Sequence, residues 1–127
     1  MDNFHLEATK HSPLISLDAT NGTLTFKGKS YPENTFMFYE PVLNWTKEYF
    51  KSPKSITTVE FEITYFNSSS SKLFFDYFDI LEKFAQNGCN IVVNWIYDEE
   101  NETALEAGED FKDDFEVLNF NLVAVQN

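Results

Sequence analysis

The chain changes from a strand pattern to a helix pattern around a run of four serines, residues 68–71. Residues 56–66, ITTVEFEITYF, alternate apolar and polar side chains, which is the period of two that a half-buried strand shows. Between residues 73 and 85 apolar side chains recur every three or four positions, the stripe of a helix that packs on a sheet. This order predicts a strand followed directly by a helix.

The first third of the chain predicts a hairpin and then a helix. Residues 14–18 and 23–27 are short β-like runs, and Asn21-Gly22 between them supplies the positive backbone angles that a tight hairpin turn prefers. Residues 36–50 place aromatic and aliphatic side chains near helical spacing. Pro41 fits such a helix only in its first turn or at a kink.

The last third predicts two further strands and a short helix. Residues 90–97, NIVVNWIY, are mostly apolar, as expected of a strand covered on both faces. The acidic stretch 98–115 has few apolar anchors and indicates a short exposed helix broken by Gly108. Residues 116–125 alternate again and predict the last strand.

Helices that cross between strands after an opening hairpin favour an α/β fold. We therefore expect a single domain over residues 1–127, with a mostly parallel mixed sheet of about five strands and helices packed on it. Residues 1–11 are expected to be mobile. The aromatic content of 17% supports an ordered core.

Charge and cysteine content exclude several classes of partner. The formal charge of −12 repels phosphate backbones and anionic lipid heads, so we expect no nucleic-acid or membrane partner. No leader and no long apolar run are visible, which predicts a cytoplasmic protein without membrane insertion. Cys89 is the only cysteine, so neither an internal disulfide nor a thiolate zinc site can form.

The serine run has a structural and a functional interpretation. Serine is a preferred N-cap residue, so Ser69 or Ser70 is expected to cap the helix, with Ser68 just ahead of it. Capping needs one hydroxyl, and the chain offers four. A helix amino terminus also favours an attached phosphate, and Lys72 is the one basic residue nearby in sequence. The hypothesis is that one hydroxyl is a phosphorylation site.

No pattern predicts catalysis or a bound cofactor. Neither His5 nor His11 belongs to a recognisable nucleophile motif, and the four glycines form no phosphate-binding loop. The carboxylates of residues 98–110 do not follow the spacing of a calcium loop, so a solvated acidic face is the favoured interpretation. We expect no catalytic residue, no cofactor and no metal.

Residues 28–34, GKSYPEN, are richer in turn-forming residues than a plain connector needs. Two interpretations are open. The residues Tyr31, Pro32, Glu33 and Asn34 form a rigid partner-contact loop, or they form a turn with a buried tyrosine.

Five segments taken in order, GKSYPEN, FYEPVLNW, EFEITYFNSSSSK, NWIYDEE and EAGEDF, resemble the SiaC family of regulatory phosphoproteins, whose fold is similar to STAS domains such as anti-sigma-factor antagonists. The resemblance runs through nearly the whole chain. It implies a non-enzymatic switch that a partner serine/threonine kinase phosphorylates and a PP2C-type phosphatase dephosphorylates. The unmodified form would bind a downstream effector such as a diguanylate cyclase, which implies a role in cyclic di-GMP signalling and biofilm regulation.

The same resemblance implies which hydroxyl carries the phosphate. The family's acceptor directly follows Asn in an N-T-S-S-x-K pattern, which corresponds here to Ser68, with Asn67 before it and Ser69, Ser70 and Lys72 after it. This chain has Ser where the family commonly has Thr, so Ser69 is an alternative acceptor. The STAS antagonists have Asp before their phosphoserine, where this chain has Asn67. An alternative function is the binding of a small ligand or nucleotide at the same helix terminus.

Overall fold

Six strands and three helices make up the computed structural model, which describes residues 1–126. The strands are β1 (Phe4–Leu6), β2 (Leu14–Asp18), β3 (Thr23–Ser30), β4 (Thr57–Phe66), β5 (Ile91–Asp98) and β6 (Asn119–Val125). The helices are α1 (Thr35–Tyr49), α2 (Ser68–Gln86) and α3 (Glu102–Asp114). The predicted α/β class, with a mixed sheet and packed helices, is confirmed.

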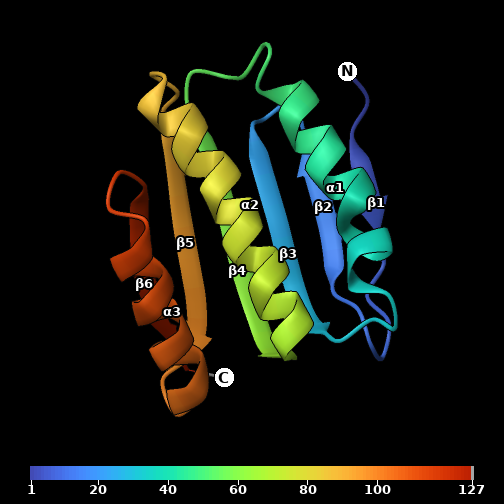
Figure 1. The fold of residues 1–127 in the computed structure, drawn as a ribbon, viewed down its shortest axis with the longest axis vertical. Coiled ribbons are helices and arrows are strands. Elements are labelled where there is room, and N and C mark those ends of the chain that lie inside the picture. Colours follow the sequence, from blue (N-terminus) through green and yellow to red (C-terminus); the bar gives the residue numbers. More distant parts are fainter. Residues whose placement is uncertain (127) are drawn as a thin grey trace.

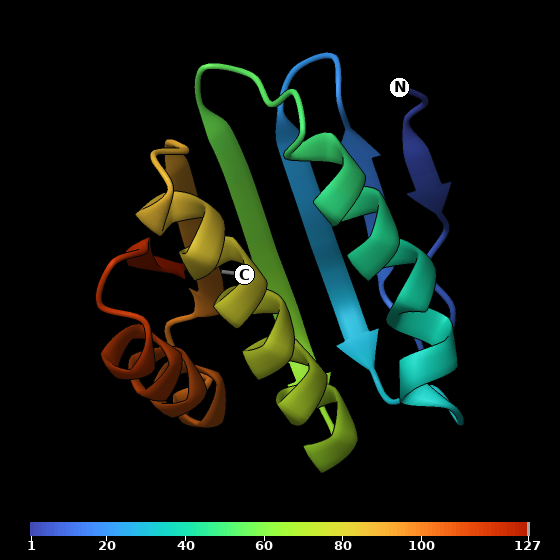
Figure 2. The same cartoon turned by 45° about the horizontal axis from the view of Figure 1, so that its top comes forward.

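The strands lie across the sheet in chain order, from β1 to β6. β1, β2 and β3 are antiparallel neighbours, whereas β3, β4, β5 and β6 are parallel and a helix connects each to the next. Crossover connections are right-handed, so connections that all step in one direction place their helices on the same face. Figures 1 and 2 show α1, α2 and α3 side by side on one face of the sheet.

The core therefore lies between the helices and one sheet face. In β5, Ile91, Val93 and Trp95 are buried against the helices, while the residues between them are only half-buried. On the other face Asn94 donates to Glu60 (3.2 Å) and accepts from Asn121 (3.3 Å). The prediction that residues 90–97 are covered on both faces is wrong, because no helix packs on the second face.

The predicted hairpin is confirmed, with a four-residue connection between β2 and β3. Only Gly22 of the Asn21-Gly22 pair has a positive φ, 67°. A Cβ atom on Gly22 would lie 2.9 Å from the Ile56 carbonyl oxygen, so the loop also needs glycine for space. The Asn21 side chain donates to Asp18 (2.7 Å), and this bond lowers the pKa of the Asp18 carboxyl.

Two local expectations need correction, and a third is narrowed. The strand β1, which pairs with β2, was not predicted within residues 1–11. Pro41 lies in the interior of α1, which excludes the first turn and leaves the other predicted placement, at a kink. α3 continues through Gly108 without a break, because that glycine lets the helix approach the sheet: a Cβ atom there would lie 2.5 Å from Trp95 Cδ1. Packing, not flexibility, explains this glycine.

Candidate functional site

The three helices begin at the same end of the sheet, where β3, β4 and β5 finish (Figure 1). We call this the carboxyl end of the sheet. An asparagine caps each helix: Asn34, Asn67 and Asn101 accept the backbone N–H of the residue three positions later, at 3.1, 2.9 and 3.1 Å. Helix amino termini carry free N–H groups and partial positive charge, so this end of the molecule favours anions.

The cap of α2 corrects the sequence-based prediction of a serine cap. β4 ends at Phe66 and α2 begins at Ser68, so Asn67 alone separates them. The Asn67 side chain accepts from the Ser70 N–H (2.9 Å) and from the Ser69 hydroxyl (3.2 Å). Asn is as effective an N-cap as Ser, and its position right after the strand decides the choice. Ser68 is therefore the first residue of the helix rather than a residue ahead of it.

The four serines lie in four different environments. Ser68 is exposed and makes no side-chain hydrogen bond within residues 1–126, whereas Ser69 is exposed but bonded to Thr35 (2.8 Å). Ser70 is fully buried and hydrogen-bonds with Ser30 (2.8 Å). Ser71 is half-buried. Accessibility alone thus leaves Ser68 and Ser69 as surface hydroxyls.

A buried hydroxyl network fixes the first turn of α2 to its neighbours. Ser70 bonds to Ser30 at the end of β3, and Ser30 bonds to the Tyr39 hydroxyl of α1 (2.6 Å). All three side chains are at most 1% exposed. Burial raises the pKa of Tyr39 far above its usual range, so its hydroxyl stays protonated in this network. The network holds β3, α1 and α2 in register at the carboxyl end of the sheet.

Lys72 lies one turn after Ser68 on the same side of α2, as residues four apart do. Its ammonium group is 3.6 Å from Asp76, a long and exposed ion pair worth little. The first turns of α1 and α2 contain no acidic residue. A phosphate on Ser68 would therefore find free N–H groups and one available cation close by.

Two grooves flank the amino-terminal half of α2. The α1–α2 groove, of about 220 Å³, is lined by Thr35, Phe36, Ser69, Lys72, Leu73 and Asp76. The α2–α3 groove, of about 400 Å³, is lined from α2 by Ser68, Ser71, Lys72 and Phe75 and from α3 by Ala107, Asp110, Phe111 and Asp114. Ser68 and Ser69 thus face different grooves, and Lys72 borders both.

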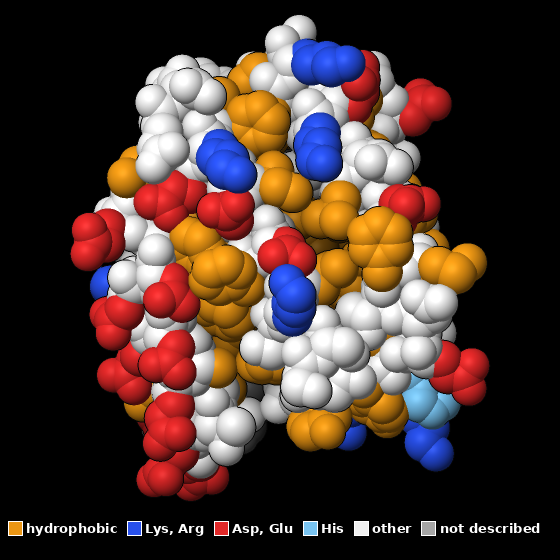
Figure 3. Space-filling model, viewed as in Figure 1, with side chains coloured by type: hydrophobic (Ala, Val, Ile, Leu, Met, Phe, Trp, Pro, Cys, Tyr) orange, Lys and Arg blue, Asp and Glu red, His pale blue; other side chains and the backbone are white. Residues whose placement is uncertain are grey.

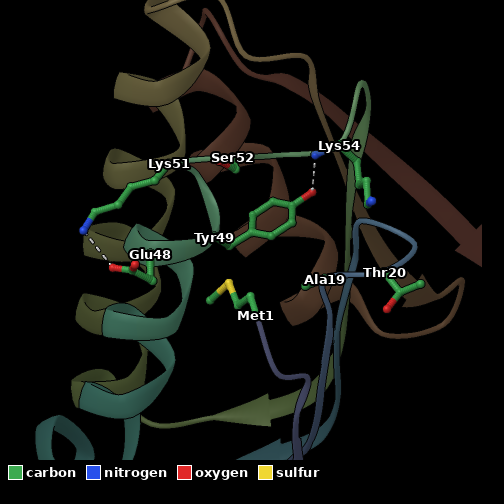
Figure 4. A pocket seen from close by; sticks show the side chains of 8 residues that line it. All are labelled: Met1, Ala19, Thr20, Glu48, Tyr49, Lys51, Ser52 and Lys54. Carbon is green, nitrogen blue, oxygen red and sulfur yellow. Dashed lines mark hydrogen bonds and ion pairs between the residues drawn. The ribbon is translucent and has the colours of Figure 1, made fainter.

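A larger cavity lies elsewhere, at the opposite end of the sheet (Figure 4). It measures about 480 Å³ and includes Lys51 and Lys54, with Glu48 paired to Lys51 (2.8 Å). No predicted site residue lines it, and every buried side-chain N or O atom in residues 1–126 has a hydrogen-bond partner. This cavity contains neither an unpartnered buried polar group nor a predicted site residue. It is therefore a weaker candidate for a functional site than the serine run.

The predicted contact loop is tied to the same end of the molecule. Tyr31 is half-buried, and its ring contacts the rings of His11 and Tyr65 edge to face, at 5.1 and 5.6 Å. Pro32 is half-buried, Glu33 is exposed, and Asn34 caps α1. Tyr31 and Asn34 therefore have structural roles, and a partner-contact role for the loop stays a prediction.

The two histidines considered for catalysis are committed to other contacts. His5 pairs with Glu7 (2.8 Å), and His11 packs on Tyr31. Within residues 1–126 no three His, Cys, Asp or Glu side chains come together as metal ligands would, and no helix is both long and apolar enough to cross a membrane.

Comparison with known proteins identifies the class of protein. The model of the SiaC family, described as regulatory phosphoproteins, matches residues 6–125, so the chain belongs to the SiaC family. An uncharacterized protein of Pseudomonas aeruginosa (strain UCBPP-PA14) is 32% identical over 114 residues, which cover 90% of each chain.

Solved structures agree with the family assignment. SiaC of Pseudomonas aeruginosa is similar with a TM-score of 0.86 at 28% identity, and the match covers 100% of both chains. A crystal structure of the diguanylate cyclase SiaD in complex with its activator SiaC, also from Pseudomonas aeruginosa, contains a chain with a TM-score of 0.86 at 29% identity, covering 98% of this chain and 99% of that one. The predicted family resemblance is confirmed, and with it a regulatory role.

Proposed function

We propose that this chain is a non-enzymatic switch in which phosphorylation of Ser68 controls the binding of an effector protein. The observation that carries the proposal is the environment of Ser68: an exposed hydroxyl without a side-chain partner, at the first residue of a helix and bordering a groove. A serine/threonine kinase would add the phosphate and a PP2C-type phosphatase would remove it. The effector would be a diguanylate cyclase, the class of the SiaD partner of the similar SiaC.

The other three serines are weaker candidates for reasons of accessibility and bonding. Ser70 is 0% exposed, so a kinase could reach it only after the helix opened. Ser71 is half-buried. Ser69 is exposed, but its hydroxyl bonds to Thr35 and Asn67, and phosphorylation would have to break both bonds. Ser69 is therefore the alternative acceptor, and Ser68 the favoured one.

A phosphate on Ser68 would change the surface rather than the fold. It would add about −1.5 to −2 charge. The free N–H groups of the first turn and Lys72 would stabilise it, while Asp110 and Asp114 line the same groove and would repel it. A hydrated dianion at the border of a groove with aromatic side chains opposes docking through its desolvation cost. The unmodified form is then the form that binds.

The proposal assigns no catalytic residue, cofactor or metal to this chain, and it places the switch in the cytoplasm. The formal charge of −12 supports protein partners over nucleic acid. The Tyr31 to Asn34 loop adjoins the switch, because Thr35 bonds to Ser69 and Ser30 bonds to Ser70. It is the second surface that the proposal offers to partners.

The test compares three forms of the full chain: unmodified, phosphorylated at residue 68, and phosphorylated at residue 69, with phosphoserine installed during translation. Each is titrated with the diguanylate cyclase of the same organism. We expect the unmodified form to bind and the form modified at residue 68 to bind at least about tenfold more weakly. Equal affinity of these two forms would contradict the proposal. Fragment mass spectra of the native protein then show which serine carries phosphate in cells.

The alternative function, a small ligand or nucleotide at the same terminus, has less support. Two carboxylates, Asp110 and Asp114, line the α2–α3 groove and disfavour an anionic ligand there. A thermal-shift series with nucleotides separates the two functions, because a specific ligand raises the melting temperature by mass action.

A further inference from the structure

The α2–α3 groove combines an apolar floor with one acidic wall. Phe75 of α2 is 41% exposed although it is aromatic, and its ring contacts Phe115 at 4.9 Å. Ala107 and Phe111 continue the apolar floor on α3. Figure 3 shows this hydrophobic surface between α2 and the outer edge of the molecule. A floor of this kind suits apolar side chains of a docked segment.

The wall on the α3 side carries negative charge. Asp110 and Asp114 are both exposed and lie one helical turn apart, so they border the same length of groove. Acidic side chains line the outer edge formed by α3 in Figure 3. Lys72, the one cation among the lining residues, is 3.6 Å from Asp76 and lies at the serine end. The wall is therefore free to pair with cations from outside.

We propose that the α2–α3 groove binds a helical segment of the effector that carries apolar residues on one face and Lys or Arg beside them. Apolar side chains would cover Phe75 and Phe111, and the basic side chains would pair with Asp110 and Asp114. The identity of the partner as the effector rests on the function proposed above. The charge of the segment rests on the groove alone, because a basic segment is the complement of an acidic wall.

The position of Ser68 at this groove predicts how phosphorylation changes the association and dissociation rates of the effector. A phosphate would increase the long-range attraction of a basic segment, so it would not slow association. It would oppose close contact, because the dianion must lose water beside the apolar floor and lies near Asp110. Phosphorylation is thus expected to act through faster dissociation, with an unchanged or higher association rate.

The test uses two double variants of the full chain with the same change in net charge. Asp110→Lys with Asp114→Lys reverses the wall, whereas Glu109→Lys with Asp113→Lys reverses two exposed carboxylates of the same helix outside the groove. Both are titrated with the diguanylate cyclase of the same organism, at ionic strengths of about 0.05 M and about 0.5 M. We expect the wall variant to bind at least about tenfold more weakly and the control to stay within about threefold of wild type.

Each outcome decides between the inference and the proposed function. An equal loss of affinity in both variants would show that only the overall charge matters. It would contradict binding at the α2–α3 groove. Wild-type affinity in the wall variant, together with lost binding after phosphorylation, would contradict binding at the groove. It would leave the proposed phosphorylation switch intact. If the affinity of the wild type does not fall as the salt concentration rises, the docked segment is not basic as proposed. A chain that does not bind the cyclase in any form would overturn both.

Discussion

The two sides of α2 contrast at the serine run. On the side of α1, hydroxyl groups bridge the elements: Thr35 bonds to Ser69, and Ser70 bonds through Ser30 to Tyr39. On the side of α3, Ser68 faces a groove of about 400 Å³ and no side-chain bond in residues 1–126 holds its hydroxyl. The side facing α1 ties the two helices together, whereas the side facing α3 leaves Ser68 accessible.

Neighbouring serines in a run can therefore have separate roles. Successive helix residues point about 100° apart, so the side chains of Ser68, Ser69 and Ser70 must leave the helix in three directions. One direction leads into the core, one to α1 and one to the α2–α3 groove. Substitutions in the serine run and in the elements on either side of it test this division.

The largest expected effect is a charge at the buried position. Ser70→Asp would place an unpaired carboxylate in a fully buried network, and we expect a loss of about 3–5 kcal/mol in the free energy of unfolding. Ser68→Asp at the exposed position should change it by less than about 0.5 kcal/mol. Urea titrations followed by circular dichroism measure both. Similar losses for the two variants would show that the serines do not differ as described.

The second prediction concerns the position of α3. Gly108→Ala would bring a methyl group to 2.5 Å from Trp95 Cδ1, so helix or indole has to shift. Overpacking of this kind typically costs about 1–3 kcal/mol. Chemical unfolding and the tryptophan emission spectrum report the stability and the shift. Ala107→Ser on the same helix, at a half-buried groove residue, is the control, and an unchanged Gly108→Ala variant would argue against close packing here.

The third prediction concerns the cap that both sides share. Asn67→Ala removes the acceptor for the Ser70 N–H and should cost about 1 kcal/mol. Asn67→Asp keeps an acceptor and places a negative charge at the helix amino terminus, so it should retain most of the stability. Thermal melts of the two variants check the ranking. If alanine proved as stable as aspartate, the Asn67 side chain would not be the cap.

The smallest expected effect belongs to the bridge between α1 and α2. Thr35→Val and Ser69→Ala each remove one partner of a bond at the surface, and we expect about 0.5 kcal/mol for each. Their double variant should lose less than the sum, because the same bond is removed twice. A double-mutant cycle in urea measures the coupling. Strict additivity would mean that the bridge contributes nothing in solution.

Most of the fold could be predicted from local patterns. The alternation in residues 56–66 and the apolar stripe after the serines correspond to β4 and α2, and the order of elements led to the α/β class. The predictions that failed have identifiable causes. β1 is only three residues long, too short to show a period, and it is held by pairing with β2. Gly108 looked like a helix breaker, because sequence alone does not show the indole that lies above it.

The candidate site was predicted in part. The asparagine, the serines and Lys72 were selected from the sequence, but the cap was assigned to Ser69 or Ser70 instead of Asn67. Ser and Asn are equally suited to capping, so propensity could not decide, and the end of β4 did. The α2–α3 groove and its acidic wall were not predicted. The sequence showed an acidic helix without showing which of its carboxylates face α2.

By itself the sequence determined every helix and strand except β1, the sign of the surface charge and the family, because periodicity, composition and ordered segments are properties of the chain alone. Only the tertiary structure decided which hydroxyl is free. The helix turns each serine toward a different neighbour, and those neighbours, Ser30, Thr35 and Asp110, come from distant parts of the chain. Long-range packing therefore gave four identical residues different chemistry.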